Sequence, residues 1–181
     1  MKKRTVRILM LALVAVMMIP MMVGCGGEKM TVTVGARLGQ DYINYMLDVE
    51  HADDDSYTIP ADDRVLLNDV PIEIEYKEGE QISALRAIQE ACLNHALDCF
   101  TNEDGNSMVT LKTYSGFTRT VKNENGDMET LVFFWTYTIN GVEPSGGRMS
   151  TNYVKDGDKV EFVLTAASSK DDVDVKGQSA E

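Results

Sequence analysis

Residues 130–139, TLVFFWTYTI, form the strongest strand pattern in the chain. Side chains on a strand alternate between two faces, so every second residue of this stretch points the same way. One face then carries five large apolar groups, which are Leu131, Phe133, Trp135, Tyr137 and Ile139. Two interpretations of that face are open: it packs in the core beneath a helix, or Trp135 and Tyr137 form a stacking platform for a flat ligand.

Turn sequences separate this stretch from its neighbouring strands. The Asn-Gly pair at 125–126 supplies the positive φ angles of a hairpin turn, which connects a strand at 117–122 to the one at 130–139. Asp-Gly-Asp at 156–158 precedes a further alternating strand at 159–165. Shorter strands are expected at 96–100 and 108–113. The C-terminal half is therefore expected to be mostly antiparallel sheet.

The preceding half supplies two more strands and the one clear helix. Alternation predicts strands at 31–38 and 70–76, and the second has Glu73 and Glu75 on a solvated face. Apolar residues at three- and four-residue steps predict an amphipathic helix at 81–95. Its core face consists of Ile82, Leu85, Ile88, Cys92 and Ala96. This order predicts an α+β domain at 31–166, β-grasp-like, with one helix packed on a mostly antiparallel sheet.

An acidic stretch without sustained periodicity interrupts this pattern at 39–68. It contains Asp53-Asp54-Asp55 and Asp62-Asp63. We expect a long surface insertion rather than a calcium site, because these aspartates lack the alternating order of known calcium loops. Residues 167–181 contain no aromatic side chain and are expected to be a disordered tail.

The N-terminus has the anatomy of an export signal. Lys2-Lys3-Arg4 precede an apolar run of about 16 residues, which is shorter than the ~20 residues that a membrane-spanning helix needs. We therefore favour a signal peptide at 1–24 over an uncleaved transmembrane anchor. Its removal takes four of the 17 basic residues and none of the 29 acidic ones, so the net charge changes from −12 to −16. Such an acidic surface argues against nucleic-acid binding.

The end of this signal, Met22-Val23-Gly24-Cys25, resembles the lipobox of bacterial lipoproteins. The resemblance implies that Cys25 carries a diacylglyceryl group and that cleavage follows Gly24. Acyl chains would then hold the mature protein on the extracytoplasmic face of the cell membrane. Residues 25–30 form a short lipidated tether in this interpretation.

Cys92 and Cys99 are the two remaining cysteines. Export permits a disulfide between them, but two separately buried thiols are the favoured interpretation. With only two histidines in the chain, a zinc site of both cysteines and His95 is disfavoured, and no metal site is expected. Ser145-Gly146-Gly147 is not a nucleophile elbow, and neither histidine lies beside a candidate nucleophile. No catalytic residue is therefore expected.

Several segments resemble the transcobalamin-like C-terminal domain, which also occurs in bacterial surface proteins. They are Phe133-Phe134-Trp135, Asn140-Gly141, residues 153–160 (YVKDGDKV) and the start of the helix after Glu78-Gly79. The resemblance implies a β-grasp fold whose Trp strand and following turn approach the ligand. Its best-known members cap cobalamin beneath a separate helical barrel. The residues that the resemblance assigns to ligand binding are Trp135, Thr136, Tyr137, Asn140 and Gly141.

These observations predict a membrane-anchored, non-catalytic binding module. The resemblance makes cobalamin or another corrinoid its expected ligand, with no required cofactor. The alternative is a cell-surface module that binds a protein or a glycan through an exposed sheet face or strand edge. A hydrolase with an unrecognised site is the third hypothesis.

Overall fold

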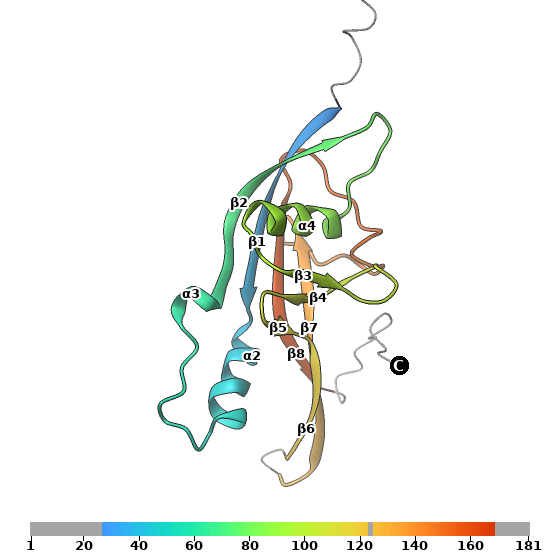
Figure 1. Ribbon diagram of the computed structural model, residues 1–181. Helices are drawn as coiled ribbons and strands as arrows, with labels where there is room; N and C mark the ends of the chain where they lie inside the picture. Colours follow the sequence, from blue (N-terminus) through green and yellow to red (C-terminus); the bar gives the residue numbers. More distant parts are fainter. Residues whose placement is uncertain (1–26, 123–124, 169–181) are drawn as a thin grey trace, which may run out of the picture.

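The computed structural model describes residues 27–122 and 125–168, which form an α+β fold dominated by sheet (Figure 1). The predicted signal peptide, Cys25 and most of the predicted tail lie outside the described residues. The strands are β1 (Glu28–Leu38), β2 (Val65–Tyr76), β3 (Cys99–Thr101), β4 (Met108–Leu111), β5 (Tyr114–Ser115), β6 (Phe117–Lys122), β7 (Met128–Ile139) and β8 (Lys159–Ser168). The helices are α2 (Gln40–Tyr45), the π-helix η1 (Met46–Glu50), α3 (Ala61–Arg64) and α4 (Ala84–Asn94).

Five strands form a mixed main sheet in the order β2-β1-β8-β7-β6. Its centre is a parallel pair of β1 and β8, in which Val34 lies opposite Val160. The other neighbouring strands are antiparallel. The remaining strands, β3, β4 and β5, form a separate small sheet.

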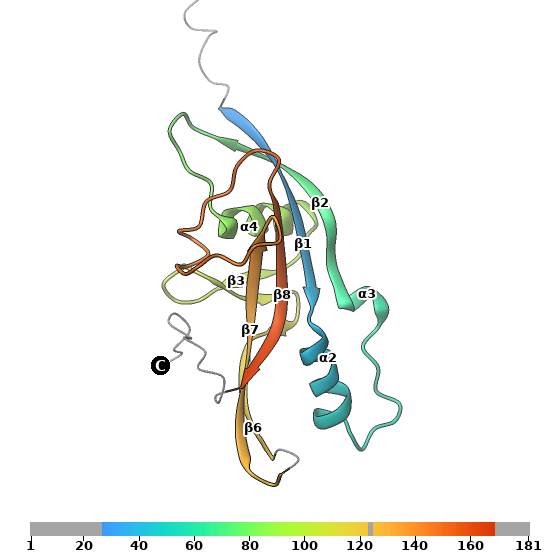
Figure 2. The same ribbon diagram turned by 180° about the vertical axis from the view of Figure 1, so that it is seen from behind.

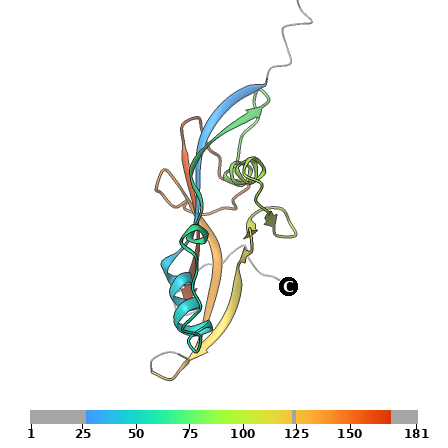
Figure 3. The same cartoon turned by 60° about the vertical axis from the view of Figure 1, so that its left-hand side comes forward.

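One face of the main sheet is covered by α4 and the small sheet, which lie on the same side of it (Figures 2 and 3). Phe133, Trp135 and Tyr137 of β7 point to this face and are at most 8% exposed. On β2 the alternation also holds, since Ile72 and Ile74 are buried while Glu73 and Glu75 are exposed. The strand faces predicted from alternation are therefore confirmed.

The helix predicted at 81–95 is observed as α4, and four of the five residues of its predicted apolar face are buried. Ile82, Leu85, Ile88 and Cys92 are each at most 4% exposed, whereas Ala96 lies beyond the end of α4 and is exposed. Ser83 caps the helix by accepting a hydrogen bond from the amide of Arg86 at 3.2 Å. Two more amides of the first turn donate to carbonyls of the 149–152 loop, so this end of the helix is well satisfied.

The opposite face of the main sheet carries charged side chains that pair across strands. Lys29 contacts Glu73 at 2.6 Å, and Arg37 contacts Glu161 at 2.6 Å. These groups are largely exposed, so each pair contributes little to stability. The face is polar because no helix among the described residues covers it.

The expectation that 39–68 is a surface insertion without regular structure is wrong in part. Residues 40–50 form α2 and η1, and Tyr42, Ile43 and Tyr45 are buried in the core together with Ile59. The helical stretch is too short for its periodicity to stand out, because α2 has only six residues before the hydrogen-bonding pattern widens. Residues 51–58 are turn and coil as expected, but α3 and the first residues of β2, from Val65 to Asn68, are further regular structure within the predicted insertion.

Two predicted boundaries also shift. The strand expected at 96–100 is limited to β3, because Ala96 takes a left-handed φ of 53° and the amide of Leu97 returns to the carbonyl of Cys92. β8 extends to Ser168, beyond the predicted start of the tail, because its end continues to pair with Leu131 of β7. No helix within the described ranges is long and apolar enough to span a bilayer.

Candidate functional site

The two aromatic residues proposed as a stacking platform lie in the core. Trp135 is 2% exposed, and its indole nitrogen donates to the carbonyl of Tyr114 at 3.2 Å. Tyr137 is 8% exposed, and its hydroxyl accepts a hydrogen bond from the Asn152 amide at 2.7 Å. Both polar atoms are thus satisfied by the protein, so these contacts favour the core interpretation over a free platform.

The other three predicted ligand-binding residues lie at the end of β7 and in its turn. Asn140 has a left-handed φ of 54°, and its side chain donates to Asp158 at 2.8 Å and accepts from the amide of Lys159 at 2.9 Å. These bonds lock the turn onto the start of β8. Gly141 is exposed with a φ of 77°, and Thr136 donates to Glu143 at 3.4 Å. All five residues therefore lie on one strand and the turn after it. The side-chain polar groups of four of them form hydrogen bonds within the protein.

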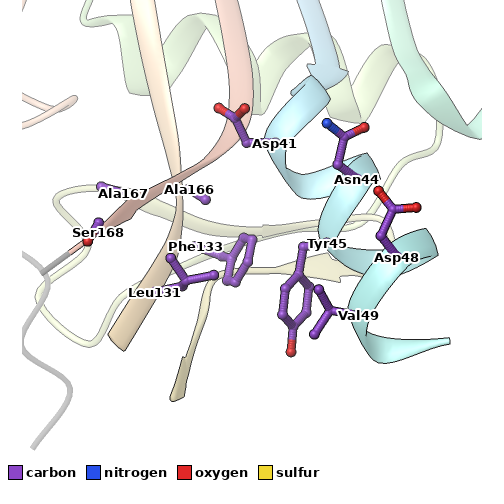
Figure 4. A pocket seen from close by; sticks show the side chains of 10 residues that line it. All are labelled: Asp41, Asn44, Tyr45, Asp48, Val49, Leu131, Phe133, Ala166, Ala167 and Ser168. Atoms are coloured by element: carbon purple, nitrogen blue, oxygen red, sulfur yellow. The ribbon is translucent and has the colours of Figure 1, made fainter. Parts of the chain in front are cut away.

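A hollow of about 460 Å³ lies between α2–η1 and the far ends of β7 and β8 (Figure 4). We call it the α2 groove. Its lining residues are Asp41, Asn44, Tyr45, Asp48, Val49, Leu131, Phe133, Ala166, Ala167 and Ser168. The volume lies within the range of small-molecule sites in proteins.

The α2 groove arises where β1 ends before its neighbour β8. The last residue of β1, Leu38, lies opposite Leu164, and the amide of Gly39 donates to the carbonyl of Leu164 at 2.7 Å. A Cβ at Gly39 would lie only 2.7 Å from that carbonyl oxygen, so the chain passes closest to β8 at this glycine. Beyond it, α2 takes the place of the strand beside the end of β8, and a helix there leaves a gap that a strand would close.

Aromatic rings form the floor of the α2 groove. The centroids of Tyr45 and Phe133 are 4.7 Å apart, and Figure 4 shows the two rings side by side at the base of the gap. Phe133 also stacks on Phe117, with centroids 4.5 Å apart, and Tyr42 meets its edge at 5.9 Å. The rings of Tyr42, Tyr45 and Phe133 are at most 6% exposed, so they form the buried aromatic backing of the groove and belong to the core.

The rim of the α2 groove is acidic. Asp41, Asn44 and Asp48 follow one edge of the helix above the rings (Figure 4). None of the cations in the described residues forms an ion pair with Asp41 or Asp48. Asn44 accepts a hydrogen bond from the Gln40 amide at 2.7 Å, and Asp41 accepts one from the Thr165 hydroxyl at 3.4 Å. The groove thus presents two carboxylates that no cation of the described residues neutralises.

A basic side chain, Arg119, pairs with Glu50 of η1 next to the groove. Arg119 contacts Glu50 at 3.3 Å, and Glu50 also accepts a hydrogen bond from the hydroxyl of Tyr45 at 2.7 Å. The bond from Tyr45, followed by the charge of Arg119, lowers the pKa of the Glu50 carboxyl. Burial, followed by the bond to Glu50, raises the pKa of Tyr45. These contacts hold the Tyr45 ring in place. Because Arg119 pairs with Glu50, it does not neutralise the rim carboxylates Asp41 and Asp48.

Sequence reasoning missed the α2 groove, although a signal for it is present. Asp41, Asn44 and Asp48 are spaced at three and four residues, which places them along one side of a helix, while Tyr42 and Tyr45 lie on another. The segment was treated as part of an acidic insertion, so this spacing was not used. Even so, spacing alone does not identify the strand ends that form the opposite wall.

No protein family model matches the chain, and no curated protein matches it. Among solved structures, the chain is similar to a crystal structure described as a "putative metal binding protein" from Ruminococcus gnavus. The identity is 14%, the match covers 76% of this chain and 98% of that chain, and the TM-score is 0.35. At this TM-score the similarity carries no argument about function. Within 27–122 and 125–168, no group of three or more His, Cys, Asp or Glu side chains is placed to hold a metal ion.

Proposed function

We propose that this protein is a membrane-anchored, extracytoplasmic, non-catalytic binding module that takes a small organic cation in the α2 groove. The observation that carries the proposal is the pair of rim carboxylates, Asp41 and Asp48, which have no counter-ion among the described residues and lie over a hollow that the buried rings of Tyr45 and Phe133 back. Carboxylates beside an apolar wall favour ammonium ions that carry an apolar group. The strongly acidic composition also attracts cations.

The position of the groove suits an anchored receptor. The anchor is proposed from the N-terminal signal and Cys25, and β1 begins at Glu28, only three residues further along the chain. In Figure 1 the start of β1 lies at one end of the elongated body and α2 lies towards the other. An anchor at Cys25 would therefore hold the groove away from the membrane, where a ligand in solution reaches it.

The topology supports a β-grasp variant as the finer description of the fold. The first and last strands of the main sheet form its central parallel pair, and α4 follows the first antiparallel pair and packs on one face. In this proposal the small sheet and α2 are additions to that framework.

The ligand proposal is tested by calorimetry on the full chain in a non-ionic detergent. Benzyltrimethylammonium is the probe, and benzoate is its counterpart of similar size and opposite charge. We expect weak saturable binding of the cation, in the ~0.1 to 1 mM range, and none of benzoate. The double substitution Asp41→Asn and Asp48→Asn should weaken the binding about tenfold, which corresponds to ~1.4 kcal/mol.

A matched control carries the same change of charge outside the groove. Asp53→Asn with Asp55→Asn removes two carboxylates from the same acidic segment, and it should leave the affinity unchanged. Equal binding of benzoate, or equal losses in both double variants, would contradict the proposed site. Cobalamin, titrated separately against the emission of the only tryptophan, Trp135, tests the corrinoid expectation.

The anchor is tested by Cys25→Ser. We expect the variant to leave the membrane fraction or to remain unprocessed, because the thiol that would carry the lipid is gone. Fractionation and gel migration identical to those of the parent would rule out the lipid anchor. This result would leave the ligand proposal intact, since the groove lies within the folded domain.

A further inference from the structure

The two thiols of the domain meet where the chain reverses after α4. At this point Ala96 is left-handed with a φ of 53°, and the amide of Leu97 donates to the carbonyl of Cys92 at 2.9 Å. The chain then enters β3, in which Cys99 pairs with Leu111 of β4. The reversal brings Cys99 back to the last turns of α4, so that both cysteines line the same hollow.

The two thiols differ in exposure. Cys92 is 2% exposed within the core, while Cys99 is partly exposed. Both line a hollow of about 510 Å³, which we call the thiol hollow. Its lining combines two exposed apolar side chains, Leu93 at 75% and Phe100 at 59%, with polar and charged ones, which are Arg86, Gln89, Glu90 and Asp98.

We propose that Cys92 and Cys99 form a thiol–disulfide exchange site for small, uncharged organic disulfides, in which Cys99 attacks and Cys92 resolves. The partly exposed Cys99 and the buried Cys92 line the same hollow. The exchange needs no further protein group, because the oxidant is the incoming disulfide itself. Glu90 and Asp98 in the lining and the acidic chain favour disulfides without negative charge.

The difference in exposure assigns the roles of the two thiols, because only Cys99 is open to an incoming disulfide. Their interaction acts in the same direction: it lowers the pKa of Cys99 and, together with burial, raises the pKa of Cys92. The thiolate is the nucleophilic form, so the more exposed Cys99 is also the more reactive sulfur. Cys92 stays protonated until its partner has been consumed.

The exchange takes two steps and balances without another reagent. The Cys99 thiolate attacks one sulfur of RSSR, the S–S bond breaks, and RS⁻ leaves with the electron pair and takes up the proton that Cys99 had lost. Cys92 then loses its proton and attacks the Cys99 sulfur of the mixed disulfide, which expels the second RS⁻; this thiolate takes up that proton. The pair is oxidised by two electrons, and one RSSR is reduced to two RSH.

The test uses the full chain carrying Cys25→Ser, so that Cys92 and Cys99 are its only thiols. The probe is bis(2-hydroxyethyl) disulfide, which is small and uncharged. Mass spectrometry of the folded protein should show the loss of two hydrogen atoms without an adduct, and alkylation should find no free thiol. Subsequent reduction should restore both thiols.

Single substitutions separate the two roles. Cys92→Ser keeps a hydrogen-bond donor beside Cys99 and should accumulate one hydroxyethylthio adduct on Cys99. Cys99→Ser should react at least tenfold more slowly, because Cys92 is buried and protonated. The same variants unfolded in urea should react at similar rates, and circular dichroism checks that each is folded.

Three results would overturn the proposal. These are a stable adduct on the protein that retains both cysteines, faster reaction of Cys99→Ser than of Cys92→Ser while both are folded, and thiols that react only in urea. None of these results depends on the anchor or on the α2 groove. Failure of the thiol exchange test therefore leaves the proposed function unaffected. Failure of the cation-binding test likewise leaves the thiol proposal unaffected.

Discussion

Both α4 and α2 bury apolar side chains against the main sheet, but α4 covers its part of the sheet more fully than α2 does. α4 has 11 residues, a serine cap and six buried side chains. α2 has six residues, no side-chain cap and three buried side chains, and η1 after it buries none. Phe133 beneath α2 and Trp135 beneath the small sheet are alternate residues of β7 and point to the same face.

This difference indicates where the molecule can bind a ligand. Around α4 the residues that face the main sheet are nearly inaccessible, so an additional molecule finds no space between the helix and the sheet, and the thiol hollow lies beside the helix. Around α2 the rings of Tyr45 and Phe133 are equally buried, but the short cover leaves a hollow of about 460 Å³ with an acidic rim beside them. Incomplete cover of a core face is therefore the structural origin of the proposed site.

The largest expected effect tests whether the α4 side is core. Leu85→Asp places a carboxylate at a position that is 4% exposed, which costs several kcal/mol and should unfold a domain of this size. Leu93→Asp on the same helix is the control, because Leu93 is 75% exposed and its variant should melt close to the parent. The melting temperatures of both variants are measured by circular dichroism. A melting temperature for Leu85→Asp near that of the parent would show that this face is not core.

The second prediction compares how much stability is lost when an isoleucine is replaced by alanine in α4 and in α2. Ile88→Ala in α4 should destabilise by about 4 kcal/mol, and Ile43→Ala in α2 by about 2 kcal/mol. Ile88 is 0% and Ile43 5% exposed, but Ile43 lies on a helix of only six residues without a side-chain cap, which can shift to close the cavity more easily than α4. Urea unfolding of both variants measures the difference. Equal losses, or a larger loss at Ile43, would mean that α2 is packed as completely as α4.

The smallest effect depends on pH and on a tyrosine of α2. Burial raises the pKa of Tyr42 to about 12 from its ordinary value of 10.0. Below pH 10 the side chain is protonated in both states. Between pH 10 and 12 it ionises only in the unfolded chain, so the parent should lose about 1 kcal/mol of stability there through this residue.

Tyr42→Phe lacks the ionisable group, so its stability should fall less steeply over the same range. Tyr153→Phe is the matched control, because Tyr153 is 49% exposed and its removal should leave the parent's alkaline profile unchanged. The measurement is the free energy of unfolding in urea at pH 9, 10, 11 and 12. Superimposable profiles for Tyr42→Phe and the parent would show that the Tyr42 ring is not buried in the folded state.

The sequence by itself determined the elements whose pattern is local and long. The alternation in residues 130–139 and the three- and four-residue steps from Ile82 to Cys92 each identified a buried face, because side-chain direction along a strand or helix depends only on nearby residues. The positive φ at Gly126 and Asn140 also matched the turns expected from Asn-Gly pairs.

Tertiary structure alone decided the grooves and the contacts between distant segments. The α2 groove exists because β1 ends opposite Leu164 while β8 continues to Ser168, and the parallel pairing of two strands so far apart leaves no local signal in either. The meeting of Cys92 and Cys99 likewise depends on a left-handed Ala96, which sequence patterns do not predict for an alanine. Periodicity specifies which side of an element is apolar, whereas the length and docking of its neighbours decide whether that side is fully covered.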